Sequence, residues 1–395
     1  MAGDRPVSVT GDLRPGVRRP SRIRDPLLIW WAGRAGLFVA VVAVSFVMAL
    51  PPGGRIHGPA SWLLERFVWW DAFHYLRIVE RGYLPPELPC CDQAFFPGYP
   101  FVTWLVRPLT GGDAVLAGLL VTQLSASVAV VLLWRLAVRS AGGDERVGRN
   151  AVLLLTVTPF GIFLSSVYSE ALFLALSLGA WLAGTNRRWW LAGSLAALAA
   201  GVRVNGLFLA AALAVMYLGQ LRADGRRLPR RDAAALILPG GVVAAYFGFL
   251  HARTGSWTNW QEAQVIAWHR ATDWPWHGLA AGWESLMTAP SNDLVLTRAA
   301  DLLTALAGIA LVGFLLIRRR FDEAVLIGLN LSVLVCSTML VSTPRYALMW
   351  FPAYVLAARF SVRPNGRWVV PVALALGPAL LVTFSITFSM HLWVA

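Results

Sequence analysis

The chain has 395 residues, of which 57% are hydrophobic and only 14% are charged, and its mean hydropathy is +0.60. A soluble globular protein of this length would carry more charge, so the composition excludes that class and predicts an all-α polytopic membrane protein. The formal charge of +13 comes from arginines that cluster in short segments between apolar runs. That clustering is typical of membrane orientation, so we expect a multi-pass protein of the cell membrane and no nucleic-acid partner.

The N-terminal region predicts a tail followed by a first membrane helix. Residues 1–26 are rich in Arg, Pro and Gly, which indicates a disordered cytoplasmic tail. Residues 27–50 form an apolar run long enough to cross about 30 Å of hydrocarbon, and Arg34 inside it is expected to extend to the membrane surface. We therefore expect residues 27–395 to form one transmembrane domain of about eleven helices, with external loops at residues 51–112 and 251–298.

The first external loop contains the most informative segment of the chain. Residues 66–83 combine interfacial aromatic side chains with an acid, a histidine and several arginines. A helix over residues 66–81 would place Asp71, His74, Tyr75 and Ile78 on one face, so Asp71 and His74 could contact the same ligand. The alternative is a polar face that is only solvated. A second aromatic segment, residues 94–101, is expected to lie in the interface beside it.

Two longer apolar blocks follow, at residues 151–183 and 189–221. One helix of about 33 residues would be roughly 50 Å long and would overshoot the bilayer, so each block is predicted to be a hairpin of two short helices. The tips fall at residues 165–170 and 201–206 and place Glu170 and Arg203 below the outer headgroups. Ionisable groups at that depth require a protein interior or a wet cavity.

The second external loop, residues 251–298, is rich in tryptophan. These side chains either anchor the loop at the interface or stack on a sugar or lipid headgroup, and Trp257, Trp260 and Gln261 are the acceptor-side candidates. The three cysteines form neither a disulfide framework nor a zinc pattern, and the adjacent pair Cys90 and Cys91 has no assigned role.

Polar residues from distant segments are all predicted to lie on the outward side: Asp71, Glu170, Arg203, Asn205 and Arg345. A carboxylate there could take the proton of an attacking hydroxyl, while guanidinium groups neutralise a departing phosphate. Purely structural roles are the alternatives for these residues. Arg203 and Glu170 could form a structural ion pair, the Arg345 side chain could extend to the membrane interface, and Glu170 could stabilise the N-terminus of its helix. His74 is expected to position Asp71 or a phosphate.

Five motifs in order resemble those of the PIG-V-type mannosyltransferases, the GPI mannosyltransferase II family and its bacterial relatives. They are Trp70 to Tyr75 with Gly82-Tyr83, Phe95 to Pro100, Tyr168-Ser169-Glu170, Arg203 to Gly206 and Pro344-Arg345-Tyr346. The resemblance implies a GT-C-like fold whose first external loop is catalytic, an inverting reaction, a polyprenyl-phosphate sugar as donor, no cofactor and no metal. By this carry-over Asp71 is the catalytic base, and Arg203 and Arg345 are candidates for the phosphate side. We also expect His74 to belong to the catalytic site, and Asn205, Tyr346, Glu170 and Tyr168 to be further donor-binding candidates.

We therefore expect transfer of mannose from polyprenyl-phosphate mannose to a hydroxyl of a glycolipid or glycan on the outer face of the membrane. The chain has no long polar domain and no Gly-rich phosphate loop, which also favours a lipid-linked donor over a nucleotide sugar. The alternatives are a transporter or flippase for polyprenyl-linked sugars, and transfer of another sugar such as arabinose. The absence of lysine indicates a GC-rich bacterial genome. Because bacteria do not make GPI anchors, the resemblance does not imply a GPI acceptor for this chain.

Overall fold

The computed structural model describes residues 24–48, 61–84, 90–226 and 230–394. The expected tail lies almost wholly outside these residues, as do parts of the first external loop. Within them the chain is helical, with no strand and one isolated β-bridge between Thr272 and Ser337. The all-α class is confirmed.

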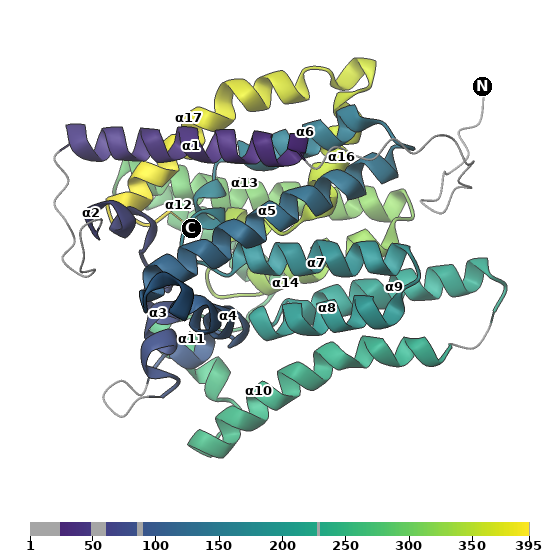
Figure 1. The fold of residues 1–395 in the computed structure, drawn as a ribbon, viewed down its shortest axis with the longest axis horizontal. Helices are drawn as coiled ribbons and strands as arrows, with labels where there is room; N and C mark the ends of the chain where they lie inside the picture. Colours follow the sequence, from purple (N-terminus) through teal and green to yellow (C-terminus); the bar gives the residue numbers. More distant parts are fainter. Residues whose placement is uncertain (1–23, 49–60, 85–89, 227–229, 395) are drawn as a thin grey trace.

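The helices run along a common direction and pack into one bundle (Figure 1). The α-helices are α1 Arg24–Val47, α2 Ser61–Leu64, α3 Asp71–Arg81, α4 Gly98–Val106, α5 Ala114–Ser140, α6 Glu145–Thr156, α7 Glu170–Thr185, α8 Trp189–Val202, α9 Gly206–Ala223, α10 Leu238–Thr254, α11 Asn259–Trp268, α12 Pro275–Met287, α13 Asn292–Ile317, α14 Phe321–Val335, α15 Thr343–Ala347, α16 Phe351–Ser361 and α17 Val369–Ser389. Short 3₁₀ helices are η1 Glu65–Phe67, η2 Asp92–Ala94, η3 Arg107–Thr110, η4 Gly161–Leu164, η5 Arg231–Ile237 and η6 Pro364–Gly366.

Six helical segments of the described chain are long and apolar enough to cross a membrane. They contain α1, α5, α9, α10, α13 and α17. The remaining bundle helices are shorter, and α7 and α8 are apolar but have only 16 and 14 residues. The chain is thus a multi-pass membrane protein, while the expected number of about eleven transmembrane helices is not confirmed.

Both long apolar blocks are broken, but only the second forms the predicted hairpin, because α8 packs against α9 whereas α6 and α7 each pack against α5. The first divides into α6 and α7, which are separated by residues 157–169 with the short 3₁₀ helix η4, and the second divides into α8 and α9 at residues 203–205. Glu170 is the first residue of α7, and Arg203 follows α8 directly. The two breaks therefore end on or contain the residues that the sequence marked as polar tips, while the first predicted hairpin is wrong.

The short helices gather at one end of the bundle. In Figure 1, α3, α4 and α11 lie at the left end, whereas the connection between α9 and α10 lies at the far right. Helix α3 packs against α4 and α5, and α11 packs against α10 and η2. The segments of both long loops therefore meet at a single end of the bundle, where the candidate site lies.

Arg34 was predicted to extend to the membrane surface, and this prediction is wrong. Its side chain is buried, and its Nη1 donates hydrogen bonds of 3.0 Å to the carbonyl oxygen of Gly161 and to Ser165 Oγ, while Nη2 donates to the carbonyl oxygen of Thr156. The break between α6 and α7 leaves carbonyl groups without helical partners, and Arg34 satisfies two of them. Hence the arginine in α1 fixes the segment between α6 and α7.

Candidate active site

Asp71 begins α3 and sits at the wall of a cavity of about 290 Å³. The cavity is lined by Asp71, Tyr75, Ala94, Phe95, Phe96, Val202, Arg203, Val204, Asn205, Trp260, Gln264, Trp268, Arg270, Arg298, Met339, Val341, Ser342, Arg345, Tyr346 and Trp393. These residues come from both long loops, from the tip between α8 and α9, from α15 and the turn before it, and from the segment after α17. The expected convergence of distant polar segments is therefore present in the structure.

Arg345 joins the two acids of the site. Its Nη1 donates a 2.6 Å hydrogen bond to Asp71 Oδ2, and its Nε donates to Glu170 Oε1. The guanidinium carbon also lies 4.6 Å from the ring centre of Tyr168, so the group is stacked as well as hydrogen-bonded. Arg345 is buried, and its two carboxylate partners compensate its charge.

Glu170 is a buried anchor for two arginines. Its side chain is fully buried, and Oε1 accepts hydrogen bonds from both Arg345 and Arg203, the latter at 2.8 Å. The same Nη1 of Arg203 donates to Ser169 Oγ at 3.0 Å, and Tyr75 donates to that oxygen at 2.8 Å. The predicted Arg203–Glu170 ion pair is therefore present, and Glu170 lies behind the cavity wall.

Two residues with left-handed φ angles precede the helices that carry Asp71 and Arg345. Trp70 has φ +56° directly before α3, and Ser342 has φ +63° directly before α15. Neither is glycine, so both conformations cost free energy that the surrounding packing must offset, about 1 to 3 kcal/mol each. Such strain clusters at functional sites, and here it sets the directions of the two site helices.

Asn205 fixes the tip between α8 and α9 to α14. Its Nδ2 donates a 2.8 Å hydrogen bond to Asn330 Oδ1, and Asn330 Nδ2 donates to the carbonyl oxygen of Leu326. Both amides are buried. Asn205 thus holds the neighbouring Arg203 in place while lining the cavity itself.

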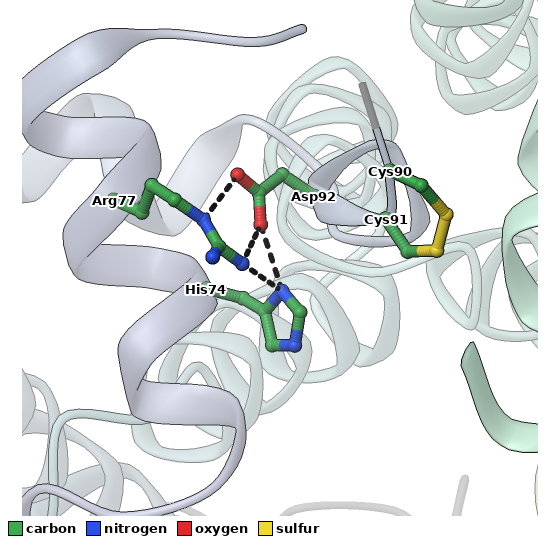
Figure 2. The surroundings of a disulfide bond; sticks show 5 residues. All are labelled: His74, Arg77, Cys90, Cys91 and Asp92. Atoms are coloured by element: carbon green, nitrogen blue, oxygen red, sulfur yellow. Dashed lines mark hydrogen bonds and ion pairs between the residues drawn. A yellow bond between two sulfur atoms is a disulfide. The ribbon is translucent and has the colours of Figure 1, made fainter. Parts of the chain in front are cut away.

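His74 has different partners from those expected. Its Nδ1 lies 2.7 Å from Asp92 Oδ1, its ring stacks on Phe95, and Arg77 binds Asp92 through two nitrogens at 2.6 and 2.7 Å (Figure 2). Burial alone would raise the pKa of Asp92, but the hydrogen bonds from His74 and Arg77 hold it below its ordinary value of 3.8. His74 therefore fastens α3 to η2 and does not line the cavity with Asp71.

The adjacent cysteines Cys90 and Cys91 form a disulfide bond immediately before Asp92 (Figure 2). This bridge was not predicted, because two neighbouring cysteines match no disulfide framework. The bridge lies beside the ion cluster of His74, Arg77 and Asp92, so it contributes to the same junction between η2 and α3.

Comparisons with known proteins find mannosyltransferases that match part of the chain. Residues 40–232 match the family described as Mannosyltransferase (PIG-V). GPI alpha-1,6-mannosyltransferase 2 of Mus musculus and of Homo sapiens are 37% and 35% identical to this chain over 166 residues. These residues are 40% of this chain and 33% of each relative, and GPI mannosyltransferase 2 of Chaetomium globosum is 31% identical over 229 residues, 48% of both.

The matched part of the chain is similar to the PIG-V mannosyltransferases. The resemblance noted from the motifs is thereby confirmed for residues 40–232, which contain Asp71, Glu170, Arg203 and Asn205. The aligned part spans about one third of the length of the mammalian relatives. An Archaeoglobus fulgidus oligosaccharyltransferase crystal structure, in the apo form, overlaps with a TM-score of 0.47 and 13% identity, covering 92% of this chain and 56% of that one.

The other residues predicted from the PIG-V resemblance and from the tryptophan-rich loop divide into three groups. Tyr346 lines the cavity, with the Arg203 guanidinium 5.0 Å from its ring centre, and so does Trp260, whose Nε1 donates to the carbonyl oxygen of Ala94. Tyr168 is buried behind the wall and donates to the carbonyl oxygen of Trp69. Trp257 stacks on His251 outside the cavity, and Gln261 is exposed and does not line it.

Sequence reasoning missed several residues of the lining. Gln264 and Trp268 follow Trp260 at four-residue steps on α11, so helical spacing from Trp260 would have found both. Arg270 lies inside the second long loop and Arg298 lies at its end, and neither belongs to a recognised motif. Trp393, near the end of the chain, packs edge-on against Trp70 and closes the cavity beside Asp71.

Proposed function

We propose that the chain is a membrane mannosyltransferase with a GT-C-like fold, in which Asp71 is the general base. The donor is polyprenyl-phosphate mannose, the acceptor is a hydroxyl of a glycolipid or glycan, and transfer inverts the anomeric carbon. The N-terminus lies in the cytoplasm and the cavity opens on the outer side of the membrane. The similarity of residues 40–232 to the PIG-V mannosyltransferases supports mannose as the transferred sugar.

The observation that carries the proposal is the state of the Asp71 carboxylate. Oδ2 is held by Arg345, while Oδ1 has no hydrogen-bond partner among the described residues, and the side chain is 16% exposed at the cavity wall. One oxygen is therefore fixed and the other is available to a hydroxyl. A base held in a single orientation at a partly enclosed cavity suits general base catalysis.

In the proposed step, the acceptor hydroxyl donates its proton to Asp71 Oδ1 while its oxygen forms a bond to the anomeric carbon of mannose. The bond between that carbon and the phosphate oxygen breaks, and polyprenyl phosphate leaves with the electron pair. Attack from the side opposite the phosphate inverts the anomeric configuration. Arginine side chains stabilise the leaving phosphate, and no cofactor or metal ion is included.

The remaining site residues position these groups. Glu170 orients Arg345 and Arg203, and Asn205 holds the tip that carries Arg203. The α11 face of Trp260, Gln264 and Trp268 offers flat rings and an amide to a sugar, and we propose this face, with Trp257 and Gln261 at its outer side, for the acceptor.

The test is transfer of labelled mannose from a short-chain polyprenyl-phosphate mannose by the purified protein in lipid, with a membrane extract as acceptor. Wild type is compared with Asp71→Asn and with Glu80→Gln, which removes an exposed carboxylate from the same helix. We expect the Asp71→Asn variant to lose at least about 100-fold in rate and the control to keep wild-type activity. NMR of the product reports the anomeric configuration.

Full activity in a folded Asp71→Asn variant would remove Asp71 from the mechanism. Transfer from polyprenyl-phosphate arabinose in place of mannose would correct the sugar. Movement of the intact donor across the bilayer by wild type, without transfer to any acceptor, would overturn the enzyme proposal in favour of a transporter.

A further inference from the structure

The cavity has more arginines than carboxylates. Its only lining carboxylate among the described residues is Asp71, and Glu170 lies directly behind the wall. These two acids form the ion pairs of Arg203 and Arg345. The lining contains four arginines in total: Arg203, Arg270, Arg298 and Arg345. Two positive charges, those of Arg270 and Arg298, are therefore left without an ion pair in the described part of the chain.

Arg270 is held by neutral groups. Its Nε donates to Ser337 Oγ at 3.3 Å and its Nη2 donates to the carbonyl oxygen of Val333 at 3.0 Å, so Nη1 has no partner among the described residues. The backbone around it is fixed, because Thr272 pairs with Ser337 in a β-bridge. The nearby acid Asp273 is engaged with His277 at 2.8 Å. Arg270 is thus a positioned guanidinium whose charge is not compensated.

Arg298 lies on α13, one turn before Asp301. The Asp301 carboxylate is turned to another group, since Oδ1 accepts the backbone N–H of Thr343 at 2.8 Å. No hydrogen bond or ion pair of Arg298 is present in the described residues. Even if Asp301 is counted, four arginines face three carboxylates, so the cavity keeps a net positive charge.

The pKa of Tyr346 is lowered by this positive charge. The side chain lines the cavity, and its burial alone would raise the pKa of the phenol. The combined influence of Arg203, Arg270 and Arg345 instead holds the pKa below its ordinary value of 10. Arg270 therefore contributes to the potential inside the cavity.

We infer that Arg270 and Arg298 form the phosphate-binding subsite of this cavity and receive the phosphate of the lipid-linked donor. The inference rests on the proposed function for the identity of that donor. Phosphate binding to Arg270 and Arg298 leaves the ion pairs of Glu170 and Asp71 intact. If Arg203 or Arg345 paired with the phosphate instead, Glu170 or Asp71 would lose its ion-pair partner, which is costly for a buried carboxylate. Arg203 and Arg345 therefore contribute fixed hydrogen-bond donors rather than net charge.

The chemistry of the leaving group matches a subsite with two positive charges. The donor is a phosphodiester with one negative charge, and rupture of the bond to the anomeric carbon converts it to a monoester with about 1.5 to 2 negative charges. Charge therefore grows on the phosphate as the bond breaks. Two guanidinium groups fixed beforehand stabilise that growing charge more than they stabilise the ground state.

The experiment measures binding of citronellyl phosphate, a short polyprenyl phosphate without sugar, to the purified full chain in detergent. The variants are Arg270→Gln and Arg298→Gln, with Arg253→Gln as the matched control because Arg253 is exposed and does not line the cavity. We expect the Kd to rise about 10-fold to 100-fold in each site variant and to stay unchanged in the control. Arg270→Lys retains the charge and is expected to keep most of the affinity, which separates loss of charge from loss of folding.

Wild-type affinity in both glutamine variants would overturn the subsite. The donor KM in the mannose transfer assay makes the two proposals separable. If wild type transfers mannose and both variants keep its KM, the subsite fails while the function stands. If wild type binds citronellyl phosphate through these arginines but transfers no sugar, the subsite stands and the proposed function fails.

Discussion

Arg345 Nη1 donates a 2.6 Å hydrogen bond to Asp71 Oδ2 across 274 positions of the chain. Asp71 and Glu170 lie within the segment that is similar to the PIG-V mannosyltransferases, whereas Arg345 lies beyond it. The two acids of the matched segment therefore share an ion-pair partner, Arg345, that lies in the C-terminal part of the chain. The site is a property of the whole bundle, because neither part alone contains a neutral ion cluster.

This relationship predicts different tolerances at two arginines. Arg345 uses separate nitrogens for Asp71 and Glu170, whereas Arg203 contacts Glu170 and Ser169 through a single nitrogen. A lysine ammonium can replace one nitrogen but not a two-pronged guanidinium. We expect Arg345→Lys to lower the mannose transfer rate at least about 10-fold and Arg203→Lys to lower it less, measured as kcat with thermal unfolding as the check on folding.

Equal losses in the two lysine variants would contradict this account of Arg345. The glutamine variant is a harsher comparison, since removal of one partner of a buried ion pair costs about 3 to 5 kcal/mol. Arg345→Gln is therefore expected to unfold at a clearly lower temperature than Arg345→Lys.

A second prediction concerns Gly98, the first residue of α4. A Cβ atom there would lie 2.7 Å from the backbone of Gly201, at the end of α8, so the tip that carries Arg203 would have to move. We expect Gly98→Ala to destabilise the protein by about 1 to 3 kcal/mol and to lower transfer as well. Gly219→Ala is the matched control, because that helical glycine has open space around its Cβ position and should gain up to about 1 kcal/mol. Similar unfolding midpoints for the two variants would argue against close contact between α4 and α8.

The parts of the site that follow from chain length and charge could be predicted from the sequence. Blocks of about 33 apolar residues are too long for one membrane helix, so the breaks near Glu170 and Arg203 could be found without a structure. The expectation that their tips lie on the same side of the membrane followed from the arginine distribution. Those two rules were enough to bring Asp71, Glu170, Arg203 and Arg345 together.

The partners of individual polar groups could not be predicted in this way. His74 is one turn from Asp71 in sequence, but its ring is claimed by Asp92 and Phe95 from a segment about 20 residues away. Arg34 has the sequence context of a side chain that extends to the interface, yet carbonyl groups freed by a distant helix break draw it inward. Arg270 and Arg298 line the cavity without an ion pair in the described residues, and this follows only from the tertiary pairing of Asp71 and Glu170 with Arg345 and Arg203. Each depends on a tertiary contact that no local pattern encodes.

A third prediction tests the contact between Asn205 and Asn330. Each single alanine variant leaves a buried amide without its partner, so each should destabilise the protein by about 1 to 3 kcal/mol. The double variant removes both groups, and we expect it to be less destabilised than the sum of the singles by about 0.5 to 1.5 kcal/mol. Thermal unfolding of the four proteins of this cycle measures that coupling. Strict additivity would mean that the amides do not interact.

The last prediction concerns the pH dependence of the junction between α3 and η2. Asp92 faces His74 and Arg77, and its pKa in the folded protein is lower than its ordinary value of 3.8. The ionised carboxylate is therefore favoured by folding, so its contribution to stability is present above about pH 4 and is lost as the pH falls through the folded-state pKa.

We expect Asp92→Asn to unfold at a lower temperature than wild type at pH 5.5, with the difference shrinking steadily toward pH 3. Glu80→Gln removes an exposed acid of α3 that has no ion pair in the described residues, and this variant should show no such trend. A difference between Asp92→Asn and wild type that is constant from pH 3 to 5.5 would mean that the Asp92 charge does not stabilise the junction. The measurement thus separates an ionic junction from one held by the shape of η2 and its neighbouring disulfide alone.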